Sequence, residues 1–401
     1  MANALGNGLL NAAYWSKVMQ EVRYKELVAM AIASVELRSV LKDGDTVHKP
    51  YRSQIGGQAY TKGTAFVVQD ISGVDDTLVV DTARIVPFYL DDVDSIQNSY
   101  NTADEFAADS MDKLNRYVDA DILGEYVNAT SDIDDGDVGG TPGNTIAVTT
   151  TNIQKIFTAA ARKLDLLNVS GKNRFAVISP SILEILRQYL EGKDTSFGDE
   201  VGNNGLVANR FGFNLHLSNN LAYTGTWTPA NNPTTGATVT INGVVFTFAT
   251  TPSAAGEVDV GSDTAGSLDN LVAAVNNSTG YAPGAGIVTS YFEVSAANRA
   301  LLEGCVATDG ATAMTIVFKG GSELVVATSE AADPWSAETL HLLFGQKGAT
   351  NLVMQKSPSI VIKDVSDKLG KNYAPWMLYG KKTFNNDKDK LVDVKIDGSA
   401  L

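Results

Sequence analysis

The chain has 401 residues, is 44% hydrophobic, and carries 46 acidic against 31 basic residues, for a net charge of −15. No apolar run approaches the roughly 18 residues that a membrane-spanning helix requires, which excludes a helical membrane protein. Lys and Arg are dispersed, whereas a nucleic-acid-binding surface needs clustered cations to neutralise phosphates. The first residues lack the basic and apolar regions of a signal peptide. The single cysteine, Cys305, excludes an internal disulfide and is typical of a reducing cytoplasm.

A long β-hairpin is predicted over residues 44–90. Alternating apolar residues predict a short rising strand over residues 46–51 and a longer returning strand over residues 76–81 that continues through 85–89. The connection between them is glycine-rich and has one apolar run, Phe66-Val67-Val68. A two-stranded ribbon is only marginally stable in water, so the hairpin needs another surface to lie on.

A long helix follows the hairpin. Thr102 and Glu105 have the spacing of a capping box, in which two side chains satisfy otherwise unpaired backbone donors at a helix start. Apolar residues then recur at spacings of three and four from Ala107 to Tyr126, which predicts an amphipathic helix that ends near Asn128.

A second block of elements begins after residue 149. Apolar spacing predicts a helix over residues 153–167, and residues 174–179 read as a buried strand. Ser179 as N-cap and Pro180 at the first helical position then predict another helix to about Leu190. Further strands are expected at residues 210–219, 360–362, 376–379 and 392–396.

A segment of different composition separates this block from the C-terminal strands. Residues 225–340 hold eleven acidic and two basic residues, a net charge of −9, which predicts a separately folding, solvent-facing domain. An Asn-Gly turn within residues 237–248 predicts a hairpin. A helix is expected over residues 268–275 with Ser267 as its cap, and strands over 287–294, 313–318 and 323–327.

The order of these elements resembles the major capsid proteins of tailed bacteriophages. Residues 174–180 match the family's R-x-x-V-I-S-P strand, and residues 212–219 match its G-x-x-x-x-x-S-N strand. The resemblance implies an α+β fold with an N-terminal arm, an extended β-hairpin loop, a spine helix, and peripheral and axial domains. The implied boundaries are arm 1–43, extended loop 44–90, peripheral domain with spine helix 91–148, first part of the axial domain 149–224, inserted β-rich surface domain 225–340, and axial return with C-terminal peripheral strands 341–401.

The resemblance also implies a function. Copies are expected to form hexamers and pentamers that build an icosahedral capsid around double-stranded DNA, without sequence-specific contacts and without a membrane. The protein is expected to be located in the virion, after assembly in the host bacterial cytoplasm. Implied partners are a portal, a separate scaffolding protein, because the arm begins almost at Met1, and a decoration or cement protein. The alternatives are an encapsulin-like compartment shell, which shares the fold, and a phage tail or adhesin protein.

The sequence contains little that indicates chemistry. No GxSxG, HExxH or GxxxxGK[ST] motif occurs, and the three histidines, His48, His216 and His341, are far apart. Residues 132–137 resemble a calcium loop only superficially, because the glycine falls one place early and the bidentate glutamate is missing. The prediction is therefore a non-enzymatic protein without a cofactor or metal.

Candidate inter-subunit contacts lie in the arm and the loop. Tyr14, Trp15 and Val18 give the arm an apolar helical face that packs either on the chain's own core or on a neighbouring subunit or scaffolding protein. Exposed ion pairs contribute at most about 1 kcal/mol each, so charged loop residues would set register rather than hold a shell together. The loop candidates are Arg52, Tyr60, Lys62 and Arg84, facing Asp75, Asp76, Asp81, Asp91, Asp92 and Asp94. The insertion either stabilises neighbouring subunits or binds a host surface or glycan.

Overall fold

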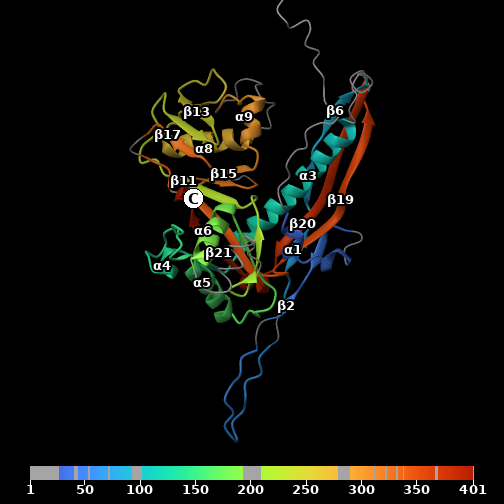
Figure 1. Cartoon of the computed structure of the whole chain (residues 1–401), viewed down its shortest axis with the longest axis vertical. Coiled ribbons are helices and arrows are strands. Elements are labelled where there is room, and N and C mark those ends of the chain that lie inside the picture. Colours follow the sequence, from blue (N-terminus) through green and yellow to red (C-terminus); the bar gives the residue numbers. More distant parts are fainter. Residues whose placement is uncertain are drawn as a thin grey trace, which may run out of the picture. The chain divides into compact units, whose positions relative to one another are not determined.

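A computed structural model of the chain divides into two compact units (Figure 1). The first contains Thr82–Asn115 and Lys356–Leu378, and the second contains Lys25–Asp81, Arg116–Gln355 and Tyr379–Leu401. The structure describes residues 27–39, 44–52, 55–70, 73–92, 102–192, 209–278, 290–310, 312–320, 323–330, 333–336, 338–365 and 369–400.

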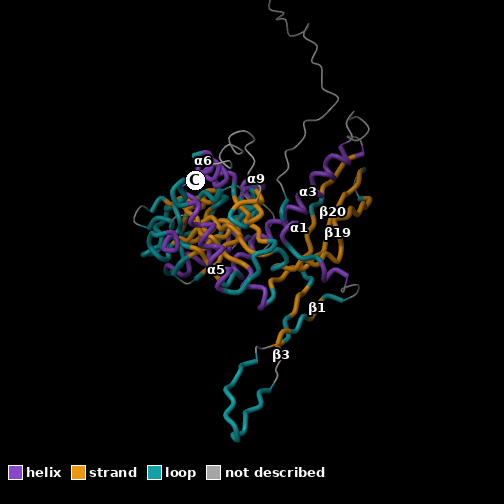
Figure 2. Tube along the Cα trace, turned by 60° about the horizontal axis from the view of Figure 1, so that its bottom comes forward, coloured by secondary structure: helices purple, strands orange, loops and turns teal. Residues whose placement is uncertain are grey.

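The first unit is a helix beside a four-stranded sheet. Its strands are β5 (Thr82–Ile85), β6 (Phe88–Asp91) and the parts of β19 (Thr350–Asp364) and β20 (Gly370–Thr383) that lie within Lys356–Leu378. The strand order is β19-β20-β5, and β6 also pairs with β20. Helix α3 (Thr102–Leu123) runs beside β19 and β20 (Figures 1 and 2). Phe88 stacks on Tyr373 with ring centroids 5.0 Å apart and meets Phe106 of α3 at 6.1 Å, so aromatic rings join the helix to the sheet.

This sheet corrects the predicted returning strand of the hairpin. Strand β4 (Thr77–Val79) ends at Val79, and the residues from Thr82 onward pair with β20 instead of continuing the hairpin. Phe88 lies opposite Tyr373 and Asp91 opposite Gly370. Local alternation predicted the strands correctly, but it could not show that their partner lies almost 300 residues further along the chain.

The hairpin in the second unit consists of two short ladders. Strand β1 (Thr46–His48) pairs with β4, and β2 (Tyr51–Arg52) pairs with β3 (Gly73–Val74). Val47 and Leu78 face each other across the first ladder, and both are buried. Residues 55–70 follow the second ladder and contain no named strand. The predicted hairpin is therefore confirmed at its root.

The predicted long helix is confirmed. Helix α3 continues into the 3-10 turn η3 (Gly124–Asn128), which ends at the expected residue. Leu114, Val118 and Ile122 on the predicted apolar face are buried. Thr102 is the first helical residue rather than the residue before it, so the helix begins one position earlier than the capping box implied. Two short helices precede α3 in the chain, the α-helix α1 (Ala29–Ile32) and the 3-10 helix η2 (Glu36–Ser39).

A nine-stranded mixed sheet forms the centre of the second unit. Its order is β15-β16-β11-β18-β8-β10-β9, with β21 beside β18 and β7 beside β21. The strands are β7 (Ser131–Ile133), β8 (Arg174–Ile178), β9 (Asn209–Arg210), β10 (Phe213–Leu217), β11 (Ala222–Trp227), β15 (Cys305–Asp309), β16 (Met314–Phe318), β18 (Thr339–Gln346) and β21 (Leu391–Asp397). The second unit also contains three short helices, the α-helix α4 (Asp135–Val138) and the 3-10 helices η4 (Asn385–Lys390) and η5 (Gly398–Ala400).

The elements predicted around the R-x-x-V-I-S-P segment are confirmed. All five residues of β8 are buried, and Ser179 caps α6 (Pro180–Glu191) by accepting a hydrogen bond from the Ile182 amide. Helix α5 (Ile153–Leu166) covers the sheet, and its Phe157 meets Phe344 of β18 at 5.3 Å. These aromatic contacts place the core between α5 and the central strands.

The insertion contains a second, four-stranded sheet. Its order is β14-β13-β12-β17, and its elements are β12 (Thr238–Ile241), β13 (Val244–Ala249), β14 (Glu257–Asp259), α8 (Thr264–Asn276), α9 (Ala296–Leu301) and β17 (Val326–Thr328). Asn242 and Gly243 both have positive φ, as the predicted hairpin turn requires. Asp263, rather than Ser267, caps α8, because the buried Ser267 hydroxyl is hydrogen-bonded to the Gly261 amide and to Asn232.

The insertion is not a separate body throughout. Strands β15 and β16 lie within residues 225–340 but extend the nine-stranded sheet, with Gly225 opposite Ile316 and Trp227 opposite Met314. The strand predicted over residues 287–294 lies partly outside the described residues, and its described part bridges β14 at Tyr291. Acidic composition identified the segment, but it could not separate strands of the inserted sheet from strands of the main one.

Candidate assembly surfaces

Within the second unit, Asp76 fixes the root of the hairpin to the segment after β20. Its carboxylate contacts Lys382 Nζ at 2.5 Å and accepts a hydrogen bond from the Asn385 amide at 2.8 Å. Burial alone raises the pKa of Asp76, but the hydrogen bonds from Lys382 and Asn385 outweigh it and hold the pKa below its ordinary value. Asp76 is buried inside the chain, which corrects the prediction that it faces another subunit.

A second contact fixes the rising strand. Lys49 Nζ lies 3.1 Å from Asp387 and 4.5 Å above the Phe384 ring, where the ring electrons attract the ammonium. A cleft of about 590 Å³ opens beside these groups, between the hairpin root and η4. Gly380 of β20 packs against the returning strand so closely that an added Cβ would lie 2.4 Å from the Val79 carbonyl oxygen. Ion pairs and close backbone packing therefore hold the root of the hairpin in place.

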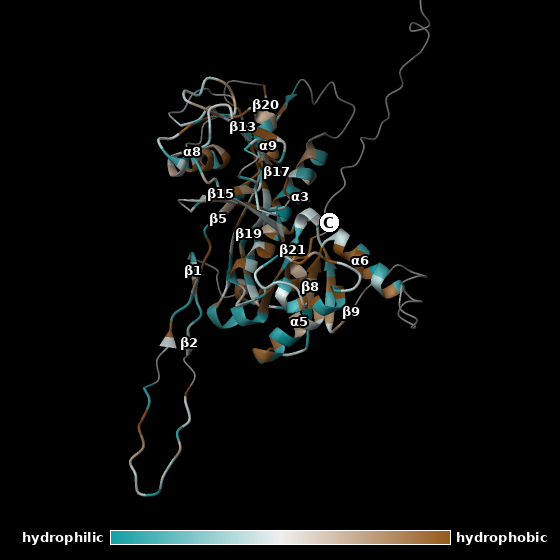
Figure 3. Cartoon of the chain, turned by 90° about the vertical axis from the view of Figure 1, so that its left-hand side faces the viewer, coloured by the Kyte–Doolittle hydropathy of each residue, from teal (hydrophilic) through white to brown (hydrophobic). Residues whose placement is uncertain are grey.

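The tip of the hairpin, residues 55–70, exposes apolar side chains. Phe66 is 67% exposed and Val68 is 78% exposed, and Ile55 and Tyr60 are similarly accessible. Figure 3 colours part of this loop as hydrophobic. The Gln58 side chain bridges the two sides of the hairpin. Its Nε2 donates a hydrogen bond to the Val67 carbonyl at 2.7 Å, and its Oε1 accepts one from the Val67 amide at 3.3 Å. Soluble monomers rarely leave clustered apolar residues in water, so this tip is a candidate assembly surface.

The other predicted contact residues are distributed between the two units. Tyr60 and Lys62 are exposed at the tip, whereas Arg84 and Asp92 are exposed in the first unit. Asp91 is half-buried and accepts a hydrogen bond from the Tyr89 hydroxyl at 3.1 Å. Arg52 lies in β2, but its side chain is outside the described residues, as are Tyr14, Trp15, Val18 and Asp94. Asp75 pairs with His48 of the same chain at 2.6 Å.

A buried carboxylate holds the residues with which the described chain begins. Asp119 of α3 is fully buried, and its Oδ1 accepts hydrogen bonds from the Val28 and Ala29 amides, both at 2.7 Å. Its Oδ2 accepts from Asn220 Nδ2 at 2.9 Å. Burial raises the pKa of Asp119, and the hydrogen bonds offset this only in part. Asp119 thus joins α1, α3 and the turn before β11.

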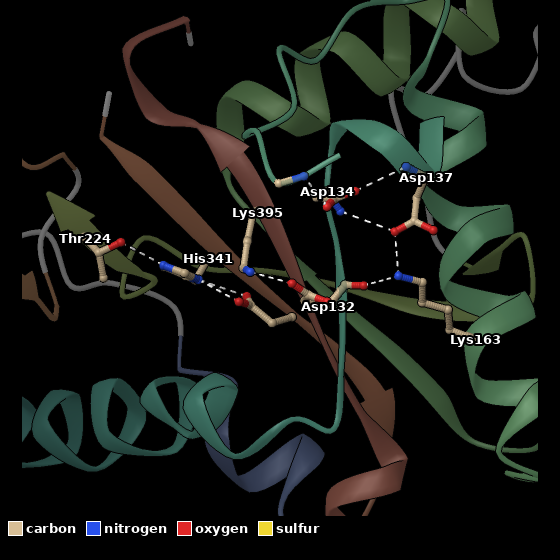
Figure 4. Close-up of polar contacts among 9 residues, drawn as sticks. Asp132, Asp134, Asp137, Lys163, Thr224, His341 and Lys395 are labelled. Carbon is tan, nitrogen blue, oxygen red and sulfur yellow. Dashed lines mark hydrogen bonds and ion pairs between the residues drawn. The ribbon is translucent and has the colours of Figure 1, made fainter. Parts of the chain in front are cut away.

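A buried histidine links three strands of the main sheet (Figure 4). His341 of β18 lies with Nδ1 2.9 Å from Asp393 of β21 and with Nε2 2.9 Å from the Thr224 hydroxyl of β11. The Tyr126 ring stacks on the imidazole with centroids 3.9 Å apart. A hydroxyl, an imidazole and a carboxylate in this order resemble a nucleophilic triad. His341 and Asp393 are buried, however, and their contacts connect strands.

The acidic residues that follow α3 cap a helix and form ion pairs within the chain. Asp134 caps the short helix α4, Asp137 pairs with Lys163 at 2.5 Å, and Asp132 pairs with Lys395 (Figure 4). The hydrogen bond from Lys395 is the main reason that the pKa of Asp132 is lowered. Within the described ranges, no group of three or more His, Cys, Asp or Glu side chains is placed to hold a metal ion.

Cys305 and the described helices offer no further functional feature. Cys305 is buried, and burial raises the pKa of its thiol to about 12, which suppresses the reactive thiolate. Of the helices in the described part of the chain, none is both long and apolar enough to cross a membrane.

Two important positions carried no signal in the sequence. Asp119 reads as one more polar residue of an amphipathic helix, and Gly380 as a glycine near a strand end. Only the distant segments that they meet, at residues 28–29 and at Val79, give them their roles. The apolar triplet at residues 66–68 was visible in the sequence, although its exposure was not.

Comparison with solved structures identifies the fold. The chain matches a structure of Mycobacterium phage Che8 with a TM-score of 0.59 and 14% identity, over 96% of each chain. It matches the capsid structure of the cyanophage P-SCSP1u with a TM-score of 0.55 and 13% identity, over 98% of this chain and 95% of that one. No family model and no curated protein matches the chain.

These matches define the class of fold. The chain is an α+β protein with the fold of bacteriophage capsid proteins, as the resemblance in its sequence predicted. The agreement extends over nearly the full length of the chain, including the hairpin and the insertion, at an identity too low for sequence comparison alone.

Proposed function

We propose that the chain is the structural subunit of the icosahedral capsid of a tailed bacteriophage, assembling as hexamers and pentamers. The observation that carries this is the capsid fold over at least 96% of the chain. The exposed apolar tip on a fixed root supports it, because soluble proteins rarely leave clustered apolar side chains in water unless the cluster is an interaction site. The role is structural rather than enzymatic.

The proposal includes the environment of the shell. The subunit lies in the virion after assembly in the host bacterial cytoplasm, and the shell encloses double-stranded DNA without sequence-specific contacts. The net charge of −15 supports loose confinement of DNA, since clustered cations would be needed for a tight grip. A scaffolding protein, a portal and a decoration or cement protein are the further proposed partners.

The proposed inter-subunit residues remain those of the arm and the loop. Tyr60 and Lys62 at the tip, and Arg84 and Asp92 in the first unit, are exposed as such contacts require. Asp91, Arg52 and the arm residues Tyr14, Trp15 and Val18 complete the proposed set. Of the two alternatives, neither the compartment shell nor the tail or adhesin protein is favoured, because both solved structures come from phages and the second is a capsid.

Electron microscopy of the purified chain tests the proposal. We expect closed shells or capsomers to appear as protein concentration and ionic strength are raised, and DNA-filled particles in lysates of infected cells. Small monodisperse particles under every condition would contradict a capsid role. Shells that enclose protein cargo without a genome would instead identify the compartment alternative.

A further inference from the structure

Both basic residues of the acidic insertion lie at the C-terminal ends of helices. Residues 225–340 contain Arg299 and Lys319 as their only Lys or Arg residues. Arg299 donates hydrogen bonds to the Val275 and Ala274 carbonyls, at 2.8 and 3.0 Å, in the last turn of α8. Carbonyls of a last helical turn have no partner within the helix and carry partial negative charge, so a cation stabilises them. Arg299 therefore stabilises a helix of the insertion itself.

Lys319 lies at the C-terminal end of α3. A Cβ added to Gly124, the residue after the last residue of α3, would be 2.9 Å from both Nζ and Cε of Lys319. The last turn of α3 has no basic residue of its own and contains the acidic Asp121. One cation reaches this turn from β20, where Lys381 Nζ donates to the Asp121 carbonyl. The insertion supplies a second cation, whose charge is favourable beside the negative end of the helix dipole.

Two further contacts join the same side of α3 to the insertion. The Tyr117 hydroxyl donates a hydrogen bond to the Glu303 carboxylate. A Cβ added to Gly320 would be 3.6 Å from the Ala120 Cβ, so the backbone at Gly320 packs close to the helix. Residues 117, 120 and 124 follow one another at spacings of three and four, which places them on one side of the helix. The insertion thus contacts α3 along about two turns.

The groups that contact α3 lie together at one end of the β15–β16 ladder. The ladder begins at the pair of Cys305 and Phe318, and just beyond it the Lys319 amide donates to the Gly304 carbonyl at 3.0 Å. Gly304 has a positive φ, and a Cβ on it would be 2.3 Å from the Lys319 carbonyl oxygen, so this position requires glycine. The closed end of the ladder therefore presents Glu303 and Lys319 to the helix together.

We propose that the insertion is a brace for α3, in which Glu303 and Lys319 hold the C-terminal part of the helix and suppress its fraying. Helix ends open more readily than helix centres, and contacts from another element raise the free energy of that opening. This part of α3, from Arg116 onward, belongs to the second unit together with the insertion. The brace acts within one subunit, so it differs from a contact with a neighbouring subunit or a host surface. In the proposed capsid it makes the stiffness of each subunit depend on the insertion.

Hydrogen–deuterium exchange of the full-length chain, followed by mass spectrometry, tests the brace. Lys319→Met removes the charge and keeps a side chain of similar length, and Tyr117→Phe removes only the hydroxyl that bonds Glu303. We expect amides at residues 118–124 to exchange about two- to fivefold faster in Lys319→Met, the factor that corresponds to one cation at a helix end. Tyr117→Phe should accelerate the same amides by up to about tenfold. Unchanged exchange of these amides in both variants would overturn the proposal.

A lysine at the end of another helix provides the matched control. Lys155 Nζ donates at 3.1 Å to the carbonyl of Val138, the last residue of α4, so Lys155→Met should leave exchange at residues 118–124 unchanged. Lys319→Arg keeps the charge and should retain the slow exchange of the unmodified chain. Faster exchange throughout the Lys319→Met chain, including α5, would show a general loss of stability and contradict a local brace.

Salt separates the charge of Lys319 from its packing. Mobile ions screen a charge near a helix end, whereas contacts of the aliphatic stem remain. We expect the difference between the unmodified chain and Lys319→Met to shrink at about 1 M salt, where the screening length falls to about 3 Å. An undiminished difference would refute the role of the charge. Exchange is measured at a protein concentration below that of assembly, so a failure to form shells would refute the capsid function and leave the brace standing.

Discussion

A single carboxylate, Asp119, organises the region where α1, α3 and the turn before β11 meet. It is fully buried and accepts hydrogen bonds from the backbone amides of Val28 and Ala29 and from the Asn220 side chain. The Ser218 side chain gives a further hydrogen bond, and no cationic group acts on the pKa of Asp119. Burial without a cation is why the pKa of Asp119 is raised rather than lowered. Removing the carboxylate would leave these buried donors without an acceptor.

Replacing Asp119 is therefore expected to be costly. Asp119→Ala leaves the Val28 and Ala29 amides unpaired in the interior, at about 1–3 kcal/mol for each buried group. Urea titration of the purified chain would measure the lost free energy of unfolding. An exposed position of the same helix provides the control, and Glu105→Ala should change stability little. Equal stability of the Asp119→Ala protein would show that water replaces the carboxylate.

The pH dependence of stability has a defined sign at Asp119. Its folded pKa is raised, so the folded state binds a proton more readily than the unfolded state does. The contribution of Asp119 to stability consequently falls as pH rises from its ordinary pKa of 3.8 through the raised value. Asp119→Asn should remove this slope in urea titrations repeated across that interval.

Glu125 provides the opposite sign for comparison. Burial alone would raise the pKa of Glu125, but the charge and hydrogen bond of Lys381, 2.9 Å away, lower it overall. Its contribution is present above the ordinary pKa of 4.5 and is lost as pH falls below it, so Glu125→Gln should remove a loss of stability in acid. Slopes of the same sign at both positions would contradict this account.

At the scale of elements, the hairpin depends on the packing of its root. Gly380→Ala would place a methyl group 2.4 Å from the Val79 carbonyl oxygen and 2.8 Å from Val80 Cα, so the root has to shift away from β20. We expect faster proteolysis within residues 55–70 and a loss of stability of about 1–3 kcal/mol. Gly57→Ala at the tip is the matched control, because nothing lies within 4 Å of its added Cβ. Unchanged proteolysis in Gly380→Ala would show that the root tolerates the shift.

The edge of the main sheet depends on one amide. Asn276→Ala would free the amide and carbonyl of Ala307 in β15 and open that edge to other chains. We expect faster aggregation, followed by light scattering during mild heating. Asn270→Ala is the control, because Asn270 lies on the same helix and bonds a backbone carbonyl, that of Asp259, away from this edge. Similar aggregation of both variants would attribute the effect to lost stability rather than to the exposed edge.

The whole molecule limits what can be removed from it. Deletion of residues 225–340 would take away β15 and β16 together with half of β11, and with them the buried side chains of Trp227, Met314 and Ile316. Strand β18 would also lose its first two residues, Thr339 and Leu340, which pair with Thr224 and Tyr223 of β11. We therefore expect this deletion to give insoluble protein, measured as the soluble fraction after expression. Soluble shells from the deleted chain would show that the main sheet closes without these strands.

Local pattern predicted most elements because their causes are local. The Ser179-Pro180 pair set the start of α6, the Asn242-Gly243 turn set a hairpin, and the apolar spacing set α3 and α5. The partners of strands are a different matter, since alternation shows that a segment is a strand and not what it pairs with. The sequence therefore could not predict the strand that pairs with β6. Nor could it predict the sheet to which β15 and β16 belong.

The sequence by itself determined the order of elements, the capsid resemblance, the absence of familiar catalytic motifs and an apolar triplet in a hairpin that cannot bury itself. Only the tertiary structure decided which loop charges are used internally, as Asp76 is, and which strands pair with which. The physical reason is that burial and pairing are properties of segments far apart in the chain. Phe66 and Val68 alternate with their neighbours like ordinary strand residues in the sequence, and only the structure shows that their side chains are exposed.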